Sequence, residues 1–224
     1  MRPFQTLLVA LVLCIAFLSE ASFAQNISLQ PKYGAQSKNE AQKAADAKFL
    51  ANIDERYKGD RKKAAEDVSA RGWQFLRQNN YPDAMRRFNQ AWLLDNTNGA
   101  ALWGMAALSS LNGNSKESLK LFAEAERFIG NDLNFEVDYA LTLGDIATRE
   151  RNEALVNEAF ARFERLHKRA PQHTRNLQNW AIILFNVGHY AKAWEKIKLA
   201  ERTPGGREID PQFIAALSEK MPRP

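Results

Sequence analysis

Apolar residues recur every three or four positions along most of the chain, a pattern that predicts a succession of amphipathic α-helices. The first clear row has a spacing of four residues and consists of Ala41, Ala45, Phe49, Ile53 and Tyr57. Asn39 stands where it can cap the start of this helix, and Gly59-Asp60 follows its end. The row therefore predicts a helix within residues 38–60.

The helical segments after residue 60 come in pairs joined by short turns. The pairs are expected near 62–79 and 81–95, 99–111 and 115–129, 133–149 and 153–169, and 174–187 and 190–202. A further amphipathic helix is expected near 211–220, before a polar tail that is expected to fray. Paired helices throughout predict an all-α fold.

Key residues of these pairs return at a fixed interval of 34 residues. Ala84, Phe88 and Ala91 are followed 34 positions later by Ser118, Phe122 and Ala125. Ala159, Phe163 and Leu166 are followed, again 34 positions later, by Ala193, Ile197 and Ala200. Such a period is typical of stacked repeats that bury their apolar faces against one another. From Ser118 to Ala159 the spacing is 41, so the third pair has seven extra residues, in longer helices or in a loop.

The period and the residues of the first pair resemble the tetratricopeptide repeat (TPR) family. In order, the matching small, aromatic, Tyr, Ala, Phe and Ala positions are Gly72, Phe75, Tyr81, Ala84, Phe88 and Ala91. The resemblance implies a TPR-like α-solenoid of about four helix hairpins over residues 61–204, with the first helices lining a concave groove. Residues 38–60 and 205–224 are expected to supply capping helices at its two ends.

The N-terminus has the pattern of a cleaved signal peptide, residues 1–24. Arg2 precedes an apolar run from Leu7 to Leu18, and the small residues Ser22 and Ala24 follow. The run has 12 residues, too few to cross about 30 Å of hydrocarbon. We therefore expect export to the periplasm, or secretion, without integral membrane insertion. Residues 25–37 are polar, with no periodicity, and are expected to form a flexible leader.

Composition narrows the function further. Cys14, within the expected signal peptide, is the single cysteine, so disulfides cannot stabilise the mature chain. The net charge is +5, and basic and acidic residues are interleaved rather than gathered in a stripe, so nucleic acid is not an expected partner. His167, His173 and His189 have no HExxH spacing, and no glycine-rich phosphate loop follows a strand. We expect neither enzyme activity, nor a metal, nor a cofactor.

Binding of a protein or peptide is the remaining class of function. The first helices are expected to present the candidate residues Trp73, Arg77, Trp103, Arg149, Arg175, Gln178, Asn179 and Asn186. Trp and Arg are frequent interface anchors, although Trp73 and Trp103 fit core packing equally well. Some TPR proteins hold chaperone tails in a Lys/Asn clamp; the matching positions of the first repeat hold Ser69 and Trp73, so that ligand is not expected.

The sequence thus predicts an exported TPR protein that holds a peptide or protein partner in its concave groove. It would act as an adaptor or scaffold in an envelope assembly, secretion or polysaccharide system. Two alternatives stay open at this point. One is a structural protein that associates with itself, and the other is an accessory or inhibitory subunit of an enzyme.

Overall fold

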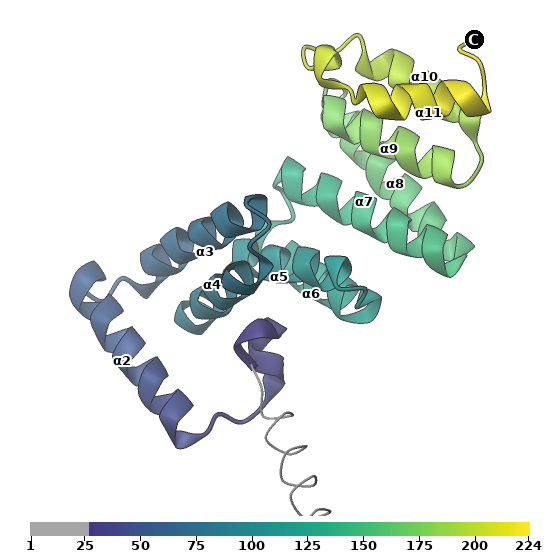
Figure 1. Ribbon diagram of the computed structural model, residues 1–224. Helices are drawn as coiled ribbons and strands as arrows, with labels where there is room; N and C mark the ends of the chain where they lie inside the picture. Colours follow the sequence, from purple (N-terminus) through teal and green to yellow (C-terminus); the bar gives the residue numbers. More distant parts are fainter. Residues whose placement is uncertain (1–26) are drawn as a thin grey trace, which may run out of the picture. The chain divides into compact units, whose positions relative to one another are not determined.

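The computed structural model describes residues 27–224, which are all-α, with no β-strand in this range (Figure 1). The all-α, TPR-like solenoid predicted from the sequence is confirmed. The predicted signal peptide lies outside the described residues. The chain divides after Asn96 into two compact units, which are described separately below.

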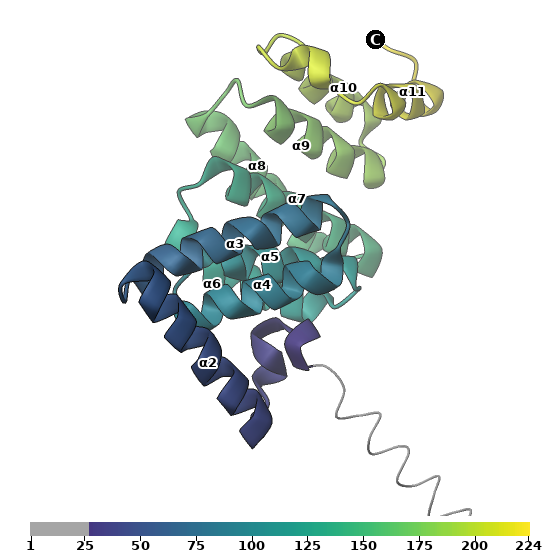
Figure 2. The ribbon, with the colours of Figure 1, turned by 60° about the vertical axis from the view of Figure 1, so that its left-hand side comes forward.

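The N-terminal unit consists of one helical hairpin with an N-terminal arm (Figure 2). Its elements are two short 3-10 turns, η1 (Ile27–Leu29) and η2 (Pro31–Ala35), and the helices α2 (Glu40–Tyr57), α3 (Arg61–Arg77) and α4 (Tyr81–Leu94). Helices α3 and α4 pack together as the hairpin.

The hairpin core requires a glycine on α3. Phe88 of α4 is fully buried, and a Cβ placed on Gly72 would lie 2.5 Å from its ring. Only a residue without a side chain therefore allows the phenyl ring to lie against the backbone of α3. The small and large positions of the predicted repeat thus pack directly against one another.

Three further hairpins and a final helix form the C-terminal unit. The helices are α5 (Gly99–Leu111), α6 (Ser115–Ile129), α7 (Leu133–Glu150), α8 (Glu153–Arg169), α9 (Thr174–Asn186), α10 (Tyr190–Ala200) and α11 (Pro211–Lys220). A 3-10 turn, η3 (Gly206–Glu208), precedes α11. The paired helices are α5 with α6, α7 with α8, and α9 with α10.

The extra residues of the third pair lengthen its helices rather than a loop. Helix α7 has 18 residues and α8 has 17, whereas α5 and α9 have 13 each. Helix α7 begins at an N-cap, Asp132, whose carboxylate accepts hydrogen bonds from the N–H groups of Asn134 and Phe135. Of the two possibilities that the spacing of 41 residues left open, longer helices and a longer loop, the structure has longer helices.

Asparagines in the predicted turns are the N-caps of the following helices. Each accepts a hydrogen bond from a backbone N–H of the first turn; they are Asn39, Asn80, Asn98, Asn114 and Asn152. Because the first N–H groups of a helix have no partner within the helix, this contact defines where each helix begins.

The N-terminal arm differs from the flexible leader expected from its composition. Residues 27–35 form η1 and η2, which contact α4. In α2, Ile53 is buried, while Ala41 and Ala45 are exposed. The helix that was expected to cap the array therefore packs on α3 through its C-terminal half.

The C-terminal tail packs on α10 instead of fraying. The indole N–H of Trp194 donates to the carbonyl oxygen of Met221 at 3.0 Å, and Lys198 donates to that of Pro224 at 2.8 Å. Arg223 forms an ion pair with Glu201 at 2.6 Å. No helix within residues 27–224 combines the length and the hydropathy needed to cross a membrane.

Candidate partner-binding site

The candidate site lies on the first helices of the C-terminal unit, α5, α7 and α9. Helix α7 contacts both of the others. Its approach to α9 is close, because a Cβ on Gly144 would lie 2.7 Å from Cγ1 of the buried Ile183. We call the surface that these three helices share the first-helix face.

A row of three side chains crosses this face from helix to helix. Asp138 of α7 forms an ion pair with Arg175 of α9, and the side chain of Arg175 remains 46% exposed. One turn earlier on α7, the ring of Phe135 meets that of Trp103 of α5 edge-on, with centroids 5.8 Å apart. The row places an aromatic ring, a carboxylate and a guanidinium on three adjacent first helices.

The carboxylate at the centre of the row is partly buried, with 32% of the Asp138 side chain exposed. Burial raises the pKa of Asp138, outweighing the Arg175 guanidinium and the Trp103 indole N–H, which both lower it. Asp138 is not among the residues that the sequence predicts to bind a partner. Its environment depends on Trp103, 35 positions earlier in the chain, whose ring also packs on the fully buried Phe135.

This pKa shift predicts a pH-dependent stability. A carboxyl group with a raised pKa in the folded state binds its proton more tightly there than in the unfolded chain. Its contribution to the free energy of unfolding is therefore lost as pH rises from the ordinary range of Asp through the raised pKa. Relative to Asp138→Asn, the parent should gain stability as pH falls from 7 to 4, measured by urea unfolding at each pH. A constant difference between the two proteins would contradict the shift.

Arg149, the residue that the sequence predicts on α7, lies farther along the helix than Asp138. The guanidinium of Arg149 pairs with Asp145 one turn earlier, at 3.1 Å, and both side chains are about half exposed. Exposed pairs of this spacing contribute at most about 0.5 kcal/mol to stability. Arg149 is therefore available for contact with a partner.

The residues predicted on α9 have different environments. Asn186 is exposed at the end of the helix. Gln178 is occupied within the protein, because its side-chain oxygen accepts the backbone N–H of Asp210 at 3.2 Å. Asn179 is 5% exposed, which removes it from the candidate surface. The helical period alone does not reveal the loss of Gln178, because the segment before α11 returns to this residue of α9.

Trp73 and Arg77 belong to α3, in the N-terminal unit. The Trp73 ring packs edge-on against Phe88 at 5.6 Å between centroids, as the Trp103 ring does against Phe135, and both tryptophans are half-buried. Arg77 is exposed near the end of α3. The predicted partner-binding residues are thus divided between the two units, and the row on the first-helix face involves Trp103 and Arg175.

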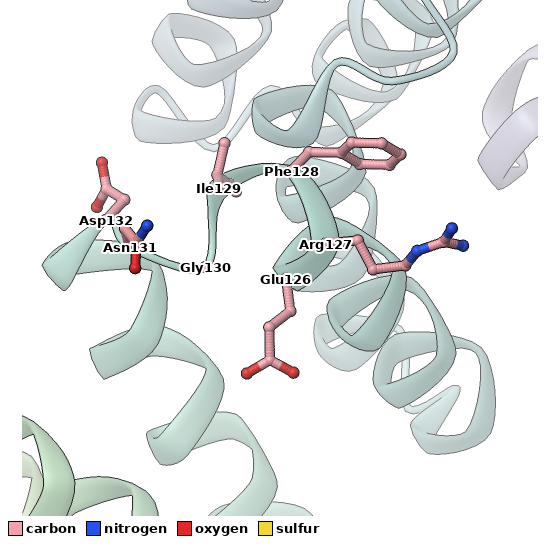
Figure 3. A pocket seen from close by; sticks show the side chains of 7 residues that line it. All are labelled: Glu126, Arg127, Phe128, Ile129, Gly130, Asn131 and Asp132. Carbon is pink, nitrogen blue, oxygen red and sulfur yellow. The ribbon is translucent and has the colours of Figure 1, made fainter.

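The C-terminal unit also has an open pocket at the turn between α6 and α7 (Figure 3). Its volume is about 380 Å³, and its lining comes from one continuous segment, residues 126–132. The ring of Phe128 is 41% exposed there, while Glu126 is held by Arg162 of α8 at 2.7 Å. Among residues 27–224, no three His, Cys, Asp or Glu side chains are grouped so that they could hold a metal ion.

No protein-family model matches the sequence, and comparison with curated proteins gives no match. Solved structures are similar in fold. TTC0263 of Thermus thermophilus, a thermophilic TPR protein, has 18% identity and a TM-score of 0.61 over 71% of this chain and 84% of its own. PilF of Pseudomonas aeruginosa has 18% identity and a TM-score of 0.58 over 71% and 70%. YrrB, a TPR protein with an unusual peptide-binding site, has 20% identity and a TM-score of 0.51 over 80% and 86%.

These likenesses concern the fold. Together with the hairpins described above, they place the protein among all-α proteins with a TPR-like fold.

Proposed function

We propose that the protein is an exported, periplasmic or secreted, adaptor or scaffold that binds a peptide or protein partner on the first-helix face. The observation that carries this proposal is the row of Trp103, Asp138 and Arg175 across three successive first helices. A peptide lying across α5, α7 and α9 would meet all three side chains. The peptide-binding site of YrrB, a protein of similar fold, supports the same kind of ligand here.

Each member of the row has a distinct use in such binding. The Trp103 ring offers apolar contact area, since indole side chains are frequent hot spots of interfaces. The half-exposed guanidinium of Arg175 can donate to a carboxylate or carbonyl of the partner while Asp138 keeps it oriented. Recognition would thus depend on packing and hydrogen bonding, without covalent chemistry.

Loss of the Trp103 ring should weaken partner binding at least tenfold, because truncating a hot spot costs about 2 kcal/mol or more. The tagged parent, Trp103→Ala and Arg175→Gln would be incubated with native envelope extract. Partners recovered by the parent would then be quantified by mass spectrometry. Leu199→Ala is the matched control, because Leu199 is an exposed apolar residue of α10, away from the row.

Circular dichroism first establishes that all four proteins have equal helical content. A partner retained by the parent and the control, but lost from both row variants, supports the proposal. Equal recovery by all four proteins would move the binding site away from the first-helix face. A parent that recovers only its own chain would favour the self-associating alternative.

Export has a separate test, which relies on the N-terminal sequence pattern. In a bacterial host, the full chain should be found in the periplasmic fraction with Gln25 as its first residue. Leu11→Arg, which interrupts the apolar run, should keep the protein in the cytoplasm at full length. An uncleaved parent chain in the cytoplasm would contradict export without affecting the binding proposal.

A further inference from the structure

A buried asparagine on α4 holds the main chain of the N-terminal arm. Asn89 is 0% exposed, and its side-chain NH₂ group donates to the carbonyl oxygens of Ser28 at 2.9 Å and Gln30 at 2.8 Å. Its side-chain oxygen accepts the backbone N–H of Tyr33 at 3.4 Å. An amide that uses both its donors and its acceptor on backbone groups recognises the path of a peptide rather than its side chains.

Two side chains of the arm add apolar and cationic contacts. The ammonium group of Lys32 lies 5.7 Å from the centre of the Trp92 ring of α4. Burial raises the pKa of Tyr33, and Lys38, paired with Asp46, lies over the Tyr33 ring. The docked segment therefore presents a basic residue followed by an aromatic one.

The repeat register shows that Asn89 occupies an outward position of its helix. Each of the core residues Phe88, Phe122, Phe163 and Ile197 is followed by a residue at this position: Asn89, Ala123, Glu164 and Lys198, respectively. Ala123 and Glu164 are exposed. Asn89 is buried because η1 and η2 cover this surface of α4 (Figure 2). Without residues 27–35, the same surface would face solvent.

The covering segment is attached in a way that allows release. Lys32, Tyr33 and Ala35 have φ values of 52–58°, a left-handed conformation that is unfavourable for residues with a Cβ. Residues 36–39 then lead into α2, whose first half leaves Ala41 and Ala45 exposed. The segment thus has three residues in an unfavourable backbone conformation, and the helix that follows it, α2, buries only Ile53, in its C-terminal half.

We propose that the surface around Asn89 and Trp92 is a second peptide-docking site, which residues 27–35 occupy in the free protein. A partner peptide with a basic residue followed by an aromatic one, in the same tight turn, displaces them. This site lies on α4, the second helix of its hairpin, whereas the first-helix face is formed by the first helices of the C-terminal unit.

The test uses a labelled synthetic peptide of residues 27–37, with both ends blocked, and fluorescence anisotropy. Tyr33→Ala in the full chain removes the half-buried ring of the resident segment and should open the site. The peptide should bind this variant at least tenfold more tightly than it binds the parent. Adding Asn89→Ala to the Tyr33→Ala chain should weaken peptide binding at least tenfold relative to the Tyr33→Ala chain alone. A peptide with alanine at positions 32 and 33 is the control ligand.

Absence of saturable binding to the Tyr33→Ala chain would overturn the proposal. Equal binding with and without Asn89→Ala, or equal binding of the control peptide, would also overturn it. If Asn89→Ala lowers the helical content, Trp92→Leu in the Tyr33→Ala chain replaces it. That change keeps an apolar residue but removes the ring beneath Lys32, and it should likewise weaken binding.

Discussion

Replacing Trp194 with alanine is expected to lower the free energy of unfolding of the C-terminal unit by about 3–5 kcal/mol, the cost of truncating a buried Trp. Trp194 is 0% exposed and lies in a core cluster with Leu184, Ile197 and Leu217. Its indole N–H also donates to the carbonyl oxygen of Met221. The substitution thus leaves a cavity and an unpaired carbonyl group. Urea unfolding followed by circular dichroism measures the loss.

Two further variants separate the causes. Trp194→Phe keeps most of the ring but loses the hydrogen bond, and should therefore cost clearly less than the alanine variant. Leu199→Ala, at a 36% exposed position of the same helix, should change stability by no more than about 0.5 kcal/mol. If Trp194→Ala lowered the free energy of unfolding no more than Leu199→Ala does, the result would contradict the packing of α10 against α11 and the tail.

The repeat architecture was predictable because its signal is local and periodic. Ala84, Phe88 and Ala91 are all 0% exposed, as their places in the 34-residue period predict. Ser118, which stands where the family has Ala, is also fully buried, and its hydroxyl donates to the carbonyl oxygen of Ala106 at 2.9 Å. Serine is small enough for the close contact that alanine makes at this position, and the carbonyl group of α5 satisfies its buried hydroxyl.

The surfaces were less predictable, because they depend on contacts between residues far apart in the chain. Asn89 has the local context of a solvent-exposed helical position, and its partners lie 56–61 positions earlier. Gln178 likewise resembles a surface residue until Asp210 takes up its oxygen. Helical periodicity shows which face of a helix is polar, but not which irregular segment returns to cover it.

The partner-binding row combines both kinds of information. The sequence places Trp103 and Arg175 on first helices, and this placement is what the structure shows. Their connection through Asp138 follows from the distance between α7 and its two neighbours. The distance between α7 and α9 depends on the absence of a side chain at Gly144.

Gly144 therefore offers a decisive substitution. In a helix without tertiary contacts, replacing Gly by Ala stabilises by about 1 kcal/mol. Here a Cβ would lie 2.7–3.0 Å from three carbon atoms of Ile183, which is itself fully buried. We expect Gly144→Ala to destabilise the protein despite its better helix propensity. Gly144→Leu should cost about 1–3 kcal/mol or more through overpacking, and should push α7 away from α9.

A double-mutant cycle with Ile183→Ala tests this contact directly. Ile183→Ala alone should cost about 2–5 kcal/mol, because it leaves a cavity. In the double variant, the leucine at position 144 can occupy that cavity, so the double variant should lose less stability than the sum of the two single variants. Additive losses, or a stabilising effect of Gly144→Ala, would show that α7 and α9 are not in this close contact. The ion pair between Asp138 and Arg175 would then lose the helix spacing on which the first-helix face depends.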